Sequence, residues 1–152
     1  MPTVALLVAL SAATPPPLPV APPPRHAVAA DISVAWRNRV SSLPDPTRDG
    51  LPQPGLLGRL FLYSATGGNA TADGRLVVEL ADGRGAVRET WTFTSDVLGK
   101  LAVGGPDAGY FLFLPLTSNP RGQGRLTTRY EPADGRPVRA AVTVIEFGAG
   151  VR

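Results

Sequence analysis

Beyond residue 30, apolar and polar residues alternate along most of the chain. A period of two indicates β-strands with one face buried and one face in solvent. In the first such segment, Ile32, Val34 and Trp36 alternate with Ser33 and Ala35. The same alternation, or a short run that is apolar on both faces, recurs between turns that contain glycine or proline. We therefore predict seven strands, within residues 32–36, 60–63, 76–80, 87–93, 110–114, 126–130 and 138–144, with Ile145 and Phe147 following a bulge. The strands at 60–63 and 110–114 are apolar on both faces and are predicted to be central.

Two segments break this rhythm. Residues 94–101 have a capping Thr94 and apolar Leu98 and Leu101 at helical spacing, which predicts one or two helical turns. Residues 42–55 contain four prolines. Because proline has no backbone N–H and is rare inside sheets, we predict a long irregular connection there.

A sheet with one apolar face must bury that face against another layer. No long amphipathic helix is predicted, so the second layer must be another sheet. The prediction is an all-β fold, an antiparallel β-sandwich of immunoglobulin-like or C2-like type with about seven strands and one short helical turn. It forms a single domain over residues 31–152. A small closed barrel is the alternative architecture.

The start of the chain has the features of an export signal. Residues 4–10 are continuously apolar, and the small residues Ser11, Ala12 and Ala13 follow them. This run suits the core of a signal peptide and is too short to span a bilayer. We predict a signal peptide over residues 1–13 and export to the periplasm, the cell envelope or the exterior, with no transmembrane span after cleavage. An apolar tail is the alternative.

A proline-rich spacer is predicted over residues 14–30. Seven of the ten residues at 15–24 are proline, which favours the extended polyproline II conformation. A semi-rigid spacer between the signal and the domain is the simplest interpretation. A ligand for a proline-binding domain is the alternative.

Composition narrows the chemistry. The chain has no cysteine, which excludes disulfides and thiolate metal sites. Its net charge is +3, but Asp and Glu are interleaved with Arg, so we expect no nucleic-acid partner. The one histidine, His26, lies in the predicted spacer, which disfavours catalytic triads and histidine zinc sites. We predict no catalytic residue, cofactor or metal site.

Two groups of charged residues are candidates for recognition. The first is Asp45, Arg48 and Asp49, which form either a recognition loop or an internally capped turn. The second is a basic stripe at Arg121, Arg125 and Arg129, spaced to project from one strand. The stripe suits an acidic partner or a sugar polymer, and charge that protects an edge strand explains it equally well.

Other acidic and aromatic residues have structural and functional interpretations. Asp73 and Asp82 each precede a glycine, as do two further aspartates, which is typical of tight turns. Calcium-binding loops are the alternative interpretation of these aspartates. Trp36 and Trp91 share the parity of aliphatic neighbours, which favours core packing over a sugar-stacking platform.

Several segments of the chain, taken in order, resemble segments of a known protein family. They include Pro54 to Tyr63, Asp73 to Val78, Trp91 to Phe93, Gly109 to Pro115 and Arg129 to Pro132. Over roughly residues 32–147 the chain resembles a family of uncharacterised, exported proteins of planctomycete bacteria. The resemblance implies a β-sandwich and a bacterial origin, and implies no catalytic residue.

These observations favour an exported, non-enzymatic β-sandwich module for binding or envelope structure. Its partner is expected to be an envelope protein or a polysaccharide. Carbohydrate-dependent or calcium-dependent surface binding is the first alternative. A small hydrolase that uses paired carboxylates is the second.

Overall fold

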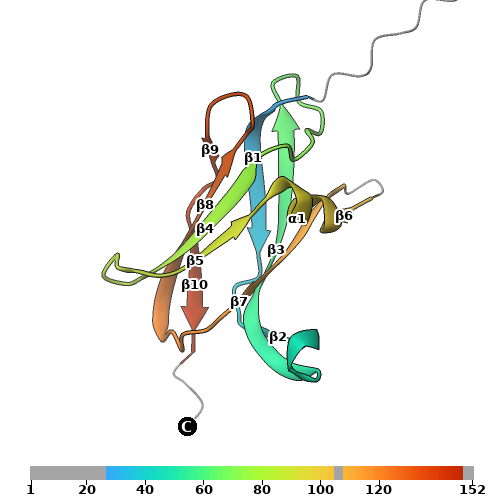
Figure 1. Ribbon diagram of the computed structural model, residues 1–152. Coiled ribbons are helices and arrows are strands. Elements are labelled where there is room, and N and C mark those ends of the chain that lie inside the picture. Colours follow the sequence, from blue (N-terminus) through green and yellow to red (C-terminus); the bar gives the residue numbers. More distant parts are fainter. Residues whose placement is uncertain (1–26, 105–107, 149–152) are drawn as a thin grey trace, which may run out of the picture.

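The computed structural model describes residues 27–104 and 108–148 (Figure 1). The predicted signal peptide, most of the predicted spacer and His26 lie outside these residues. The described chain folds into two antiparallel five-stranded sheets, in agreement with the predicted all-β sandwich. No helix within the described ranges has the length and apolar character that crossing a membrane requires.

The first sheet, called sheet A, is built around β3 (Leu51–Ser64). Its strand order is β1-β3-β7-β6, and β2 also pairs with β3. The other members are β1 (Ala29–Trp36), β2 (Ser41–Asp45), β6 (Ala102–Val103) and β7 (Gly109–Pro115).

The second sheet, called sheet B, is built around β4 (Arg75–Asp82) and β8 (Gly122–Glu131). Its order is β10-β8-β4-β5, and β9 also pairs with β8. The other members are β5 (Val87–Phe93), β9 (Val138–Arg139) and β10 (Thr143–Phe147). The six-residue helix α1 (Ser95–Lys100) links β5 of sheet B to β6 of sheet A, which agrees with the predicted helical segment.

The core lies between the sheets. Alternation along each strand sends every second side chain inward, and these residues form one apolar cluster. Its fully buried members are mostly leucines, with one tyrosine on β8. They are Leu56, Leu60, Leu112 and Leu114 of sheet A, Leu76, Val78, Leu80, Leu126, Tyr130 and Ile145 of sheet B, and Leu98 of α1. Trp36 and Trp91 pack against this cluster, as the core interpretation predicted.

The prediction of an irregular connection over residues 42–55 is wrong. β2 and the start of β3 form a hairpin there, joined by a 3-10 turn, η1 (Pro46–Arg48). Pro44 faces Pro52 across the hairpin. In an antiparallel pair, alternate residues turn their N–H away from the partner, so prolines of one parity leave the ladder intact. The spacing of the prolines, rather than their number, therefore determines whether this segment can form paired strands.

The last predicted strand is divided in two. Val138 faces Tyr130, but Thr143 faces Leu126, so one extra residue is inserted between β9 and β10. A one-residue bulge reverses which side chains point inward. Val144 is therefore exposed and Ile145 is buried. With β2, β6 and this division, residues 27–104 and 108–148 contain ten strands where seven were predicted.

Candidate functional site

A cleft of about 400 Å³ lies at the end of the sandwich where the β4–β5 turn approaches the β7–β8 loop. Leu80, Ala81, Gly124 and Phe147 form its apolar part. Polar side chains surround this part and carry both donors and acceptors. They are Asp82, Arg88, Ser118, Asn119, Arg121 and Gln123. A volume of this size and an apolar base with a few polar groups are typical of small-ligand sites.

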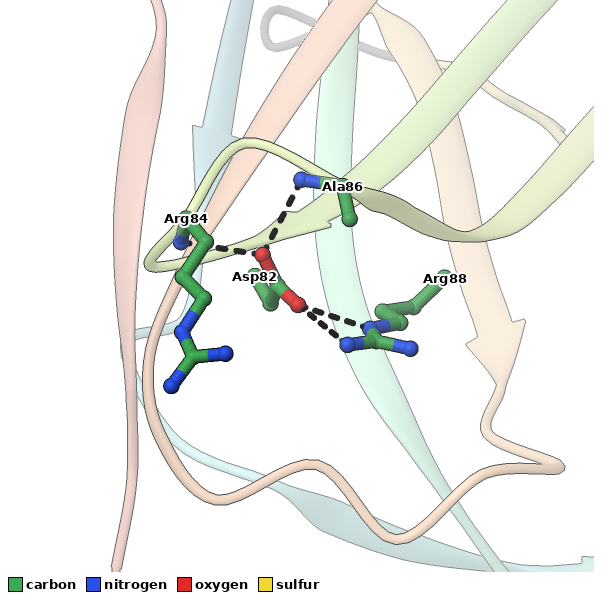
Figure 2. Close-up of polar contacts among 4 residues, drawn as sticks. All are labelled: Asp82, Arg84, Ala86 and Arg88. Carbon is green, nitrogen blue, oxygen red and sulfur yellow. Dashed lines mark hydrogen bonds and ion pairs between the residues drawn. The ribbon is translucent and has the colours of Figure 1, made fainter.

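Asp82 organises one wall of the cleft (Figure 2). One carboxylate oxygen accepts hydrogen bonds from the backbone N–H of Arg84 at 2.9 Å and of Ala86 at 3.0 Å. The other accepts from Arg88 Nε at 2.8 Å and Nη2 at 2.5 Å. The hydrogen bonds from Arg88 and from the turn hold the pKa of Asp82 below its usual range. Asp82 therefore caps its own turn, as the turn interpretation predicted, and fixes the guanidinium of Arg88 at the cleft.

Glu89 holds the opposite wall. It lies on the edge strand β5 opposite Leu80, and its carboxylate reaches the β7–β8 loop. That carboxylate accepts hydrogen bonds from the backbone N–H of Thr117 at 3.1 Å and of Ser118 at 2.9 Å. It also accepts from the hydroxyl groups of both residues. A side chain of sheet B thus fastens the loop that leaves sheet A.

Three further hydrogen bonds hold the base of the same loop. Trp91 Nε1 donates to the carbonyl oxygen of Pro115 at 3.0 Å, and Gln53 Nε2 donates to that of Leu116 at 3.0 Å. The backbone N–H of Leu116 donates to the carbonyl of Pro54 at 2.8 Å. With both sheets bound to the loop, the cleft has a preformed wall, and a ligand would not have to order it.

The residues that line the cleft carry an excess of positive charge. Two carboxylates lie behind this lining, Glu89 bound to Ser118 and Glu146 bound to Gln123. Among the lining residues, Asp82 is the one carboxylate, and Arg88 neutralises it. Within the described residues, the guanidinium of Arg121 makes no ion pair or hydrogen bond with another side chain. An exposed, unpaired guanidinium beside a preformed wall can bind a carboxylate through two parallel hydrogen bonds.

The predicted basic stripe is not one surface. Arg121 lines the cleft, whereas Arg125 and Arg129 point outward from β8. Arg129 Nε lies 3.0 Å from Glu131, which also binds Arg75. The Arg75 hydrogen bond, followed by the charges of both arginines, lowers the pKa of Glu131. Edge protection is the wrong explanation for this group, because β8 lies between β4 and β10.

The structure keeps Asp45, Arg48 and Asp49 together around η1. Asp45 accepts from the backbone N–H of Thr47 at 2.9 Å and from its hydroxyl at 2.7 Å. These bonds, the hydroxyl bond foremost, and the charge of Arg48 lower the pKa of Asp45. Asp49 takes a left-handed conformation with φ of 53°. The geometry is that of a self-capped turn, the structural interpretation of this segment.

The acidic side chains of the predicted loops do not form a cluster in the described residues. Within residues 27–104 and 108–148, no three Asp, Glu or His side chains are placed to share a metal ion. Asp73 is engaged with the hydroxyl of Tyr130 instead. The calcium interpretation of the Asp-rich loops therefore has no cluster to build on in the described part of the chain.

Sequence reasoning did not identify Arg88, Glu89 and Asn119 as residues of a site. Glu89 lies opposite Leu80, so its side chain points inward from the edge strand β5. A charged residue at an inward position of an edge strand is unusual, and the alternation along β5 could have marked Glu89 as a candidate. Its partners, 28 and 29 residues away along the chain, could not have been found. Comparisons with protein-family models, with curated proteins and with solved structures find no match to this chain.

Proposed function

We propose that this chain is an exported, non-enzymatic β-sandwich module that binds an acidic polysaccharide of the cell envelope in the end cleft. The observation that carries the proposal is the unpaired Arg121 beside a loop held by Glu89. A uronic acid unit combines a carboxylate with several hydroxyl groups. The cleft combines a guanidinium with the amide of Asn119, the Ser118 hydroxyl, which donates to Glu89 and can still accept, and the Gln123 amide, which has one N–H bound to Glu146.

The chemistry of the cleft favours binding over hydrolysis. Glycoside hydrolysis ordinarily requires two carboxyl groups on either side of the scissile bond. Asp82 is the one carboxyl group among the lining residues, and four hydrogen bonds already occupy its oxygens. The Glu89 carboxylate in the opposite wall is bound to Thr117 and Ser118 of the loop. A lowered pKa also makes Asp82 a poor general acid at neutral pH.

Binding is tested by titrating the full chain with polygalacturonate and, separately, with neutral dextran. We expect saturable binding to the acidic polymer only. Arg121→Ala is expected to weaken it by about 10-fold to 100-fold, the value of a hydrogen-bonded charge pair. Isothermal titration calorimetry gives both affinities.

Arg125→Ala is the matched control, because it removes the same charge four residues further along the chain, from the outer face of β8 and outside the cleft. It is expected to leave the affinity within twofold. Equal losses in the two variants would mean diffuse charge attraction and would contradict the assignment of the cleft. Absence of binding to the acidic polymer would contradict the proposed ligand.

Export rests on the apolar run at residues 4–10 and the small residues after it. Fusing residues 1–30 to a periplasm-dependent reporter is expected to export the reporter and to remove about 13 residues, by the geometry of signal cleavage. Mass spectrometry of the exported product locates the cut. A reporter that stays in the cytoplasm would refute this part of the proposal. Membership of the planctomycete family remains part of the same proposal.

A further inference from the structure

The outer surface of sheet A is apolar and aromatic. Side chains of β3 and β7 that point away from the core form what we call the outer aromatic face: Leu57, Arg59, Phe61, Phe111 and Phe113. Phe111 is 42% exposed. Leu57 is only 7% exposed although it lies outside the core cluster, so the neighbouring residues of this face cover it.

Strands that are apolar on both faces are ordinarily covered on both faces. β3 and β7 are such strands, and they lie next to each other. Their inner faces meet sheet B, but within residues 27–104 and 108–148 no third layer lies over their outer faces. Three of the five phenylalanines of the chain lie on this uncovered surface.

Arg59 adds a polar feature to the middle of the face. It is paired with Phe111 in the ladder, and its guanidinium carbon lies 6.0 Å from the centroid of the Phe61 ring. Its Nε is buried and has no hydrogen-bond partner within the described residues. A buried donor without an acceptor is costly, so an acceptor supplied from above would stabilise the face.

The face thus requires an occupant with apolar rings and free carbonyl groups. A polyproline II helix has both, because its pyrrolidine rings are apolar and none of its backbone carbonyls is used internally. Grooves lined by aromatic side chains bind such helices in other proteins. We propose that residues 15–24 of this same chain lie across the outer aromatic face, with backbone carbonyls accepting from Arg59.

The segment can reach the face. Ten residues of polyproline II extend about 31 Å, at 3.1 Å per residue. Phe61 and Leu57 are separated by four residues of strand, about 13 Å. The segment ends five residues before β1, whose first residue, Ala29, faces Ser64 of β3, three residues from Phe61. A short tether of this kind gives an effective concentration in the millimolar range, which exceeds that of a free partner. Signal cleavage near Ala13 would leave the segment in place.

A second copy is a less suitable occupant. Two outer aromatic faces laid against each other would bring two Arg59 guanidinium groups together in a dry interface, at an electrostatic cost. Face-to-face pairing would also supply no acceptor for the unpartnered Nε. The proline segment has no acidic or basic side chain over residues 15–24, so it avoids that repulsion.

Fluorine NMR of the full chain, labelled with 4-fluorophenylalanine, tests the proposal. Phe61, Phe111 and Phe113 report on the face, and the core residues Phe93 and Phe147 are internal controls. Replacing the seven prolines of residues 15–24 by serine is expected to shift the first three signals and to raise their relaxation by a dissolved gadolinium chelate several-fold. The two core signals should not move.

Adding the synthetic peptide 14–24 to the serine variant at millimolar concentration should reverse these shifts. Arg59→Met should expose the same three fluorines, whereas Arg84→Met, in the distant β4–β5 turn, should not. Equal accessibility of the three fluorines before and after proline replacement would overturn the proposal. Shifts that disappear on dilution would show a segment from a second chain and would also overturn it.

Discussion

Replacing Leu80 by alanine is expected to lower the free energy of unfolding by about 2–5 kcal/mol, the range for truncating a fully buried leucine. Leu80 belongs to the core cluster and also forms the base of the end cleft. A Cβ on Gly124 would lie only 2.8 Å from Leu80 Cδ1, so the backbone of β8 rests directly on this side chain. The ladder between β4 and β8 prevents that backbone from moving inward, and a cavity remains.

Urea unfolding followed by tryptophan fluorescence measures this effect. Val87→Ala is the control, because Val87 lies on the neighbouring strand and is exposed. It should change the free energy of unfolding by less than about 0.5 kcal/mol. If Leu80→Ala lowered the free energy of unfolding as little as the control, the residues at this end of the sandwich would be able to close the cavity. That result would contradict a preformed site.

Tyr130→Phe is expected to cost about 1–3 kcal/mol at pH 7, because it leaves a backbone donor and a carboxylate without their partner. Tyr130 is fully buried on β8. Its hydroxyl accepts from the backbone N–H of Gly74 at 2.8 Å and donates to Asp73 at 2.9 Å. The hydroxyl thereby ties the start of β4 to the core. Tyr63→Phe is the control, since the Tyr63 hydroxyl makes no hydrogen bond within the described residues.

The same tyrosine is expected to make the free energy of unfolding fall at alkaline pH. Burial, followed by the neighbouring Asp73, raises the pKa of Tyr130 to about 12. The protonated phenol is therefore favoured by folding, and this contribution is complete below about pH 10, the pKa of an unfolded tyrosine. It should be lost as the pH rises from about 10 towards 12.

Urea unfolding at intervals from pH 8 to pH 11.5 tests this dependence. The difference in free energy between the wild type and Tyr130→Phe should narrow above about pH 10. A difference that stays constant over this range would mean that the phenol ionises equally in the folded and unfolded chain, against the effect of burial.

Strands that depend on local sequence patterns could be predicted, whereas strands that depend on pairing with a distant segment could not. β5 begins and ends at the predicted residues, because its alternation and its flanking turns are local features. β2 could not be predicted from proline content, because its pairing depends on which parity the prolines have relative to β3. For β10 the sequence predicted the inward positions of Ile145 and Phe147 after a bulge, but it placed the bulge after Val144, whereas the inserted residue lies between Ala140 and Thr143.

The end cleft was less predictable than the fold. Asp82 was recognisable as a turn residue, because its partners Arg84 and Ala86 lie two and four residues away. Arg121 was recognisable as a candidate, but its place in a cleft rather than on a strand face was not. The site depends on Glu89 reaching a loop more than 25 residues away, and no local pattern encodes that distance.

The sequence by itself determined the all-β class, the short helix, the core interpretation of both tryptophans and the role of Asp82 in its turn, because each depends on neighbours within a few residues. Only the tertiary structure decided how the strands are ordered in the two sheets, which arginine enters the cleft and which apolar face is left uncovered. The apolar runs of β3 and β7 predict burial on both faces, yet only the packing of the two sheets decides which of those faces is filled. That choice depends on strand order, which short-range alternation does not specify.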